Sequence, residues 1–252
     1  MACEIGNRTV LKFDTEDGVA VALARYIADL SERFIKEKGS FNVVLSGGSL
    51  IDTMRYLTRA PYKESVDWPK WSIFWLDERV VPLDSKDSNY RLAWDGLLKY
   101  VTIPNNQIYA INDKLSPEGA AEDYEARLRD LVDRRILPLS NASGFPSFDL
   151  MLVGMGPDGH VASLFPNRPQ RYEKKRWVTY ITDSPKPPPP RITLTFPVIN
   201  SSSEIAMVVT GADLAGAVKD VLENPDSDLP ASEVSAQGLL TWFLDNDAAS
   251  QL

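Results

Sequence analysis

The chain contains one histidine, His160, and it lies in a glycine-rich segment that begins at Gly154. The apolar run 148–153 precedes this segment, which indicates a loop at the C-terminal end of a buried parallel strand. Imidazole has an unperturbed pKa of ~6.5, close to cellular pH. Asp158, two residues earlier, can orient the imidazole or stabilise its charge. The pattern predicts acid–base chemistry at His160, although a lone histidine is also common at surfaces or as a hydrogen-bonded core residue.

Gly154, Gly156 and Gly159 also satisfy the G-x-G-x-x-G pattern of dinucleotide-binding loops. That pattern requires a helix that opens at the third glycine and points its N-terminus at a pyrophosphate. Pro166 and Pro169 would interrupt such a helix. We therefore do not expect nicotinamide binding, and no cofactor is predicted.

Two more loops follow apolar strands and suit an anion. The first is Ser46-Gly47-Gly48-Ser49, whose glycine N–H groups and following helix favour negative charge, although a simple strand-to-helix turn has the same composition. It lacks the lysine of a P-loop, so a nucleoside triphosphate is not indicated.

The second of these loops is Asp77-Glu78-Arg79. Arg79 can hold a phosphate or carboxylate bidentately. A structural ion pair of Arg79 with Asp77 or Glu78 is an equally good interpretation.

The periodicity of apolar residues predicts the elements that position these loops. Strands separated by helices favour an α/β fold with a largely parallel sheet and helices on both faces. We expect one domain over residues 1–252, with loops at 140–146 and 184–190. The predicted helices cover 16–37, 51–57, 89–100, 117–136 and 212–222. The predicted strands cover 42–45, 72–76, 148–153, 177–181, 205–209 and 241–244.

Composition excludes several classes of protein. The 252 residues are 44% hydrophobic, and the net charge of −8 argues against a nucleic-acid surface. No stretch approaches the ~20 apolar residues of a membrane span, and no signal peptide is evident. One cysteine indicates a reducing compartment, and one histidine with one cysteine cannot supply the usual metal cluster. We expect a cytoplasmic protein without metal, and a monomer is favoured.

Two short motifs remain open. The run Pro187–Pro190 is either a stiff connector, which we favour, or a polyproline ligand for a partner domain. The tripeptide Ser250-Gln251-Leu252 differs by one residue from the peroxisomal signal Ser-Lys-Leu. We favour a chance tripeptide over peroxisomal targeting.

The three loops together resemble those of the 6-phosphogluconolactonase family. The resemblance is carried by Leu45-Ser-Gly-Gly-Ser-Leu50, by Trp75-Leu-Asp-Glu-Arg79 with Asp87-Ser-Asn-Tyr90, and above all by Gly156-Pro-Asp-Gly-His-Val-Ala-Ser-Leu-Phe-Pro166. It covers essentially the whole chain. Ser49-Leu50, where many bacterial members have Ser-Thr-Pro, resembles the eukaryotic cytosolic branch.

The resemblance implies a Rossmann-like fold shared with glucosamine-6-phosphate deaminases. It implies hydrolysis of 6-phospho-D-glucono-1,5-lactone to 6-phosphogluconate in the oxidative pentose phosphate pathway, with a small sugar phosphate as the partner. His160 would be the catalytic base, and Asp158 its partner. The expected substrate-binding residues are Ser46, Gly47, Gly48, Ser49, Asp77, Arg79, Gly156 and Arg191.

One position departs from the family pattern. Leu214 stands where the family usually has a lysine that is expected to bind the substrate phosphate, and Lys219 lies more than one turn further along the predicted helix. This departure keeps open a non-catalytic relative that binds a sugar phosphate or a protein partner. A sugar-phosphate isomerase or deaminase is the other alternative, but that pattern continues with Phe-Asn-Glu-Pro where this chain has Ser163-Leu-Phe-Pro166.

Overall fold

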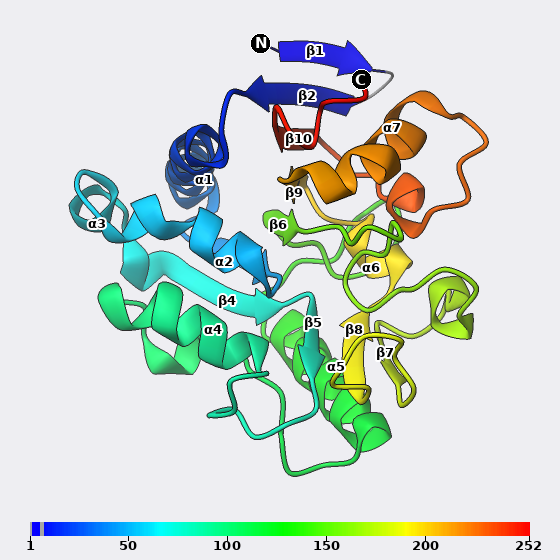
Figure 1. Cartoon of the computed structure of the whole chain (residues 1–252). Coiled ribbons are helices and arrows are strands. Elements are labelled where there is room, and N and C mark those ends of the chain that lie inside the picture. The colour runs from blue at the N-terminus through cyan, green and yellow to red at the C-terminus, as the bar shows by residue number, and fades with distance from the viewer. Residues whose placement is uncertain (1, 6–7) are drawn as a thin grey trace.

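The computed structural model describes residues 2–5 and 8–252, and its centre is a seven-stranded sheet (Figure 1). The strand order is β1-β2-β10-β9-β6-β3-β4. β1 is antiparallel to β2, whereas the other neighbours pair in parallel. The strands of this sheet are β1 (Ala2–Ile5), β2 (Arg8–Phe13), β3 (Phe41–Leu45), β4 (Trp71–Trp75), β6 (Leu150–Val153), β9 (Glu204–Val209) and β10 (Leu240–Asp245). The mainly parallel α/β prediction is confirmed.

A second, three-stranded sheet has the order β5-β8-β7 and is antiparallel. Its strands are β5 (Asp77–Arg79), β7 (Val178–Ile181) and β8 (Arg191–Leu194). The predicted strand 177–181 therefore exists, but it does not belong to the parallel sheet. No helix follows β7 to carry the chain back in the parallel direction; the proline-containing loop returns it directly into β8.

Helices cover both faces of the parallel sheet, so side chains of the central strands point alternately into two apolar layers. Val43 of β3 packs in the layer of α1 and α4, whereas Val44 packs in the layer of α5, α6 and α7. The helices are α1 (Glu16–Lys38), α2 (Ser49–Thr53), α3 (Tyr62–Ser65), α4 (Asn89–Gly96), α5 (Pro117–Asp133), α6 (Phe196–Ile199) and α7 (Ala215–Glu223). In the described residues no helix is long and apolar enough to cross a membrane.

The ends of α1 follow the sequence signals. The Thr15 side chain accepts a hydrogen bond from the N–H of Gly18, and Gly39 ends the helix with a φ of 83°. α5 begins at Pro117 as predicted, but it ends at Asp133 rather than at residue 136. Arg135 has a φ of 58°, which is incompatible with a continued right-handed helix.

Three other predicted helices are shorter or divided. The prediction 51–57 covers α2 and a separate 3₁₀ turn, Arg55–Thr58; 89–100 covers α4 and the 3₁₀ turn Leu98–Tyr100; and 212–222 covers the 3₁₀ turn Ala212–Leu214 and α7. Residues three apart lie on one side of both helix types, so apolar spacing alone does not separate them.

Strands β1, β2, β5 and β8 were not predicted. β2 has the sequence Arg-Thr-Val-Leu-Lys-Phe, and only Val10 in it is buried. Its pattern therefore lacks the long apolar run that marks the central strands.

Candidate active site

Three loops meet at one end of the parallel sheet because the strands before them are neighbours. β9, β6 and β3 are adjacent, and their loops start at Thr210, Gly154 and Ser46. Ligands collect at such carboxyl ends of parallel strands. β5 adds Asp77 and Arg79, and the cavity that results has a volume of about 270 Å³. It is lined by Ser46, Gly47, Gly48, Ser49, Leu50, Asp77, Arg79, Asn89, Gly154, Met155, Gly156, His160, Ala162, Arg191, Val208, Thr210 and Leu214.

His160 is held by the turn that contains it. Its Nδ1 lies 2.5 Å from Oδ1 of Asp158, and its ring packs against Phe165 with 4.6 Å between the centroids. The N–H of Gly156 donates to the carbonyl of His160 at 3.0 Å. A Cβ at Gly156 would lie 2.1 Å from the imidazole, so this close approach requires glycine. Within the described residues, Nε2 of His160 has no hydrogen-bond partner.

Asp158 does not line the cavity but acts on it through His160. Burial raises the pKa of the Asp158 carboxyl, but the hydrogen bond and the charge interaction with His160 outweigh that effect and lower the pKa overall. The carboxylate therefore stays ionised at neutral pH. Bound to Nδ1, it fixes the ring so that Nε2 is the nitrogen available to a ligand.

Arg79 keeps much of its guanidinium unused. Nη1 donates to the carbonyl of Asp87 at 2.8 Å, whereas Nε is buried without a partner. Among the described residues its side chain forms no ion pair with Asp77 or Glu78. The alternative of a structural ion pair with Asp77 or Glu78 is therefore wrong, and Arg79 lines the cavity without a counter-ion among the described residues.

Glu78 instead accepts hydrogen bonds from uncharged groups. Its carboxylate accepts from the N–H of Arg79 at 2.7 Å, of Asn89 at 2.7 Å and of Tyr90 at 2.8 Å. The hydroxyl of Ser88 also donates to it, at 3.0 Å. Burial raises the pKa of Glu78 to about 7, although these four hydrogen bonds oppose that shift.

Arg191 lines the cavity, but most of its donors are already used. The side chain is 3% exposed, and its Nε and Nη2 donate to the carbonyls of Pro188 and Lys186 at 3.0 and 2.8 Å. Nη1 donates to the hydroxyl of Ser163 at 3.3 Å, and Ser163 donates to Asp77 at 2.6 Å. Arg191 therefore anchors the proline run to the wall of the cavity, as expected for a stiff connector.

The loop 46–49 lies in the wall as predicted, with different tasks for its residues. The Ser46 hydroxyl donates to the carbonyl of Leu152 at 2.9 Å and so joins the loop after β3 to β6. The N–H groups of Gly47 and Gly48 make no hydrogen bond within the described part of the chain. These two donors are therefore available at the cavity.

Asn89 is a cavity residue that the sequence analysis did not select. Its Nδ2 donates to the carbonyl of Asp77 at 2.9 Å, and its Oδ1 is buried without a partner. A Cβ at Gly47 would lie 1.9 Å from this oxygen, so the glycine makes room for the carboxamide. Its position directly after the N-cap Ser88, on the helix that follows the Arg79 loop, is the signal that could have identified it.

Leu214 lines the cavity while it also packs against the apolar layer of α7. Lys219 does not replace the lysine that the family pattern has at position 214. Its Nζ binds the carbonyl of Gln251 at 2.9 Å and Glu223 at 3.3 Å, outside the cavity. In the described residues, the permanently charged cations of the lining are Arg79 and Arg191.

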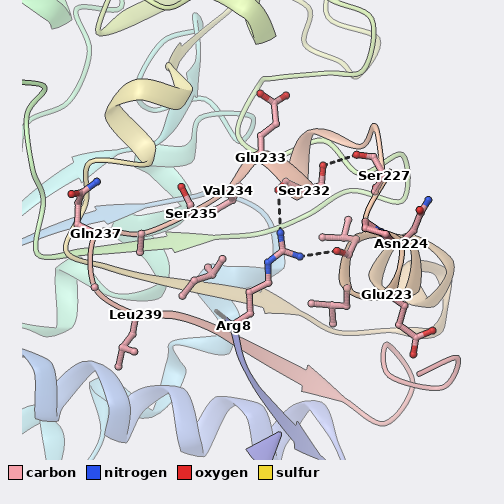
Figure 2. A pocket seen from close by; sticks show the side chains of 16 residues that line it. Arg8, Glu223, Asn224, Ser227, Ser232, Glu233, Val234, Ser235, Gln237 and Leu239 are labelled. Atoms are coloured by element: carbon pink, nitrogen blue, oxygen red, sulfur yellow. Dashed lines mark hydrogen bonds between the residues drawn. The ribbon is translucent and has the colours of Figure 1, made fainter. Parts of the chain in front are cut away.

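A larger cavity, of about 1130 Å³, lies at the opposite end of the strands (Figure 2). It adjoins the starts of β2 and β10, at Arg8 and Leu240. The Arg8 guanidinium donates to the carbonyls of Val221 and Ser232 at 2.7 and 3.1 Å. Arg8 therefore joins α7 to the following loop, and this cavity contains none of the predicted site residues.

Comparison with known proteins places this geometry in a family. A family model described as glucosamine-6-phosphate isomerases/6-phosphogluconolactonase matches residues 14–242. A rice protein named probable 6-phosphogluconolactonase 4, chloroplastic, is 58% identical over 96% of this chain and 76% of its own length. The Arabidopsis thaliana protein named probable 6-phosphogluconolactonase 5 is 50% identical over 98% of this chain and 100% of its own.

Solved structures give the same result. The 6-phosphogluconolactonase from Trypanosoma brucei superposes with a TM-score of 0.85 at 27% identity, covering 97% of this chain and 98% of the other. The 6-phosphogluconolactonase from Thermotoga maritima gives 0.79 at 31% identity, covering 94% and 99%. The agreement extends over nearly the whole chain.

Proposed function

Because the chain belongs to the glucosamine-6-phosphate isomerase/6-phosphogluconolactonase family, we propose that it hydrolyses 6-phospho-D-glucono-1,5-lactone to 6-phosphogluconate with His160 as general base. The observation that carries this proposal is the His160–Asp158 pair, which leaves Nε2 free at a cavity that also contains Arg79 and unpaired glycine N–H groups.

The chemistry requires little beyond these groups. A lactone is an activated ester, so water is a sufficient nucleophile once a neutral imidazole accepts its proton at Nε2. Such a base contributes a factor of ~10²–10⁴ to the rate. Asp158 stabilises the imidazolium that forms. The oxygen of the lactone carbonyl gains negative charge as the tetrahedral intermediate forms, and the N–H groups of Gly47 and Gly48 are donors available for it. Collapse of the intermediate breaks the ring C–O bond, and the proton returns to the leaving hydroxyl.

The substrate phosphate is assigned to Arg79. Its Nη2 has no hydrogen-bond partner among the described residues, and a planar guanidinium suits binding of a phosphate. Arg191 contributes positive charge from the wall rather than free donors. The phosphate site therefore has one available guanidinium, and Leu214 adds an apolar surface beside it.

A deaminase or isomerase is less consistent with the site, because the buried Ser163 stands where that pattern has phenylalanine and Phe165 stands where it has glutamate. A non-catalytic relative is also less consistent with the site, because it needs neither the ionised Asp158 carboxylate on the imidazole nor the open Nε2 of His160.

A coupled assay tests the proposal. The purified protein is incubated with the lactone, and 6-phosphogluconate is detected through its dehydrogenase, with spontaneous hydrolysis subtracted. Catalysed hydrolysis that depends on His160 is expected. Binding of 6-phosphogluconate without catalysis would favour the non-catalytic relative, and release of ammonia from glucosamine 6-phosphate would favour the deaminase.

A cytosolic location and a monomeric state belong to the same proposal. The single cysteine among 252 residues supports a reducing compartment. The rice relative carries the word chloroplastic in its name, so a cell-fractionation experiment with the untagged chain is the appropriate test of location. That experiment also tests whether Ser250-Gln251-Leu252 directs the protein to peroxisomes.

A further inference from the structure

Glu78 closes the segment between β5 and α4 upon itself. Its carboxylate binds the N–H of Arg79 at the start of this segment and the N–H groups of Asn89 and Tyr90 at its end. The Ser88 hydroxyl, which caps α4, provides the fourth hydrogen bond. Figure 1 shows α4 beside β4, and its first residues, Asn89 and Tyr90, lie at β5. Glu78 is 1% exposed and forms no ion pair with any described residue, so these donors are what stabilises its charge.

The two ends that Glu78 joins carry two polar side chains that line the cavity, Arg79 and Asn89. Arg79 has a buried Nε without a partner, and Asn89 has a buried Oδ1 without one. Each is also tied to the other end of the segment: Arg79 Nη1 donates to the carbonyl of Asp87, and Asn89 Nδ2 to the carbonyl of Asp77. The relative position of Arg79 and Asn89 therefore depends on closure of the segment.

We infer that Glu78 is a positioning residue: it does not touch the substrate, but it fixes Arg79 and Asn89 in the geometry that binds the sugar phosphate. This inference rests on the proposed function for the identity of the ligand. Misplacement of a binding group by about 1 Å costs orders of magnitude in some enzymes, so a carboxylate that sets the distance between two such groups has a direct effect on affinity.

The test is a comparison of three variants by kcat, KM and the affinity for 6-phosphogluconate measured by calorimetry. Glu78→Gln keeps the volume but replaces one acceptor oxygen by a donor that faces N–H groups. Glu125→Gln is the control outside the cavity: Glu125 also accepts from two backbone N–H groups, those of Trp177 and Val178 at 2.8 and 3.1 Å, and it pairs with Arg129 at 2.6 Å. Ser88→Ala removes one donor to Glu78 together with the N-cap of α4, and it tests the closure of the segment if Glu78→Gln does not fold.

The expected result is a KM and a product Kd raised about 10-fold or more in Glu78→Gln, with a smaller fall in kcat. Ser88→Ala should shift both constants in the same direction by less, and Glu125→Gln should leave both unchanged. A purely structural role would lower the amount of folded protein and leave the constants of the remaining enzyme intact.

The inference and the proposed function fail in different ways. The positioning role would be overturned if folded Glu78→Gln had the same KM and the same product affinity as the wild-type protein, while lactonase activity stands. If Glu78→Gln does not fold, the same result in Ser88→Ala would overturn it. A wild-type protein without lactonase activity would overturn the proposed function. In that case, weaker binding of 6-phosphogluconate by Glu78→Gln than by the inactive wild-type protein would still support the positioning role of Glu78.

Discussion

The two cavities lie at opposite ends of the same parallel strands and differ in whether their polar groups already have hydrogen-bond partners. The larger one, of about 1130 Å³, contains an arginine whose guanidinium already donates to two carbonyls. The smaller one, of about 270 Å³, contains an imidazole nitrogen, an arginine Nε and an asparagine oxygen without partners among the described residues. Nε of Arg79 and Oδ1 of Asn89 are buried without a partner, and a buried polar atom is costly to a fold unless a ligand or water completes its hydrogen bonding. Volume alone would have selected the wrong end.

Replacement of His160 should give the largest effect at the smaller cavity. His160→Ala and His160→Gln remove the base, and kcat should fall by a factor of ~10²–10⁴ while the fold is retained. In wild-type enzyme, kcat/KM should fall at acid pH as an essential base is protonated, and this limb should vanish in both variants. Circular dichroism controls for folding. Near-wild-type rates in either folded variant would contradict the assignment of the base.

The titration of Glu78 makes the unfolding free energy of the wild-type protein depend on pH. Its folded pKa of about 7 lies above the unfolded value of ~4.3, so its contribution to stability is present at low pH and is lost as the pH rises towards 7. Between pH 4.5 and 8, wild-type protein should therefore lose up to about 3 kcal/mol of unfolding free energy relative to Glu78→Gln. The charged or titratable groups nearest Glu78 are Asp77 and Arg79 on β5, Arg191 on β8 and Tyr124 on α5.

Urea unfolding at a series of pH values measures this difference. Contributions of other groups cancel between the two proteins where they act independently of residue 78. Parallel pH profiles would show that the buried carboxylate has an ordinary pKa.

Removal of the Arg79 side chain should weaken binding more than it slows the chemical step. Arg79→Ala loses a charge-assisted contact with the phosphate, which costs about 1.5–3 kcal/mol and appears mainly in KM. Arg91→Ala is the matched control, because Arg91 pairs with Asp95 on α4 and does not line the cavity. An unchanged KM would remove Arg79 from the phosphate site.

Addition of a cation at position 214 sharpens the comparison further. Leu214→Lys should lower KM for the 6-phosphorylated lactone by about 5- to 150-fold, equivalent to 1–3 kcal/mol, and should have little effect on unphosphorylated gluconolactone. Leu214→Met retains the contact with the apolar layer and controls for packing. Lower thermal stability without a gain in KM would mean that the packing role of Leu214 dominates.

The larger cavity should give the smallest effect on activity. Arg8→Met removes two hydrogen bonds to carbonyls, so unfolding free energy should fall by about 1–3 kcal/mol. Because the two ends of the strands are distant, kcat/KM should stay within about twofold of the wild-type value. A tenfold loss of kcat/KM at full folding would break the distinction between the two cavities.

The sequence predicted the parts of this site that depend on local pattern. An apolar strand is followed by polar side chains at Ser46, at Arg79 and at His160, and glycines accompany Ser46 and His160, so all three loops could be identified. The roles of Asn89 and of the hydrogen bonds to Glu78 were not predicted, because they depend on a segment that folds back over ten residues. β8 was missed for a similar reason: its pairing with β5 brings together residues more than a hundred positions apart.

The edges of the main sheet influence how the protein behaves at high concentration. One edge is β1, which has four residues and runs antiparallel to its neighbour. At the other edge, Ile73 of β4 forms a bridge with Ile108, and the N–H of Tyr109 donates to the carbonyl of Ile73 at 2.9 Å. Long, flat, unpaired edges are templates for strand addition between molecules, and these edges are short or partly covered. Both edges therefore offer little backbone for cross-molecular sheet growth, which favours resistance to aggregation.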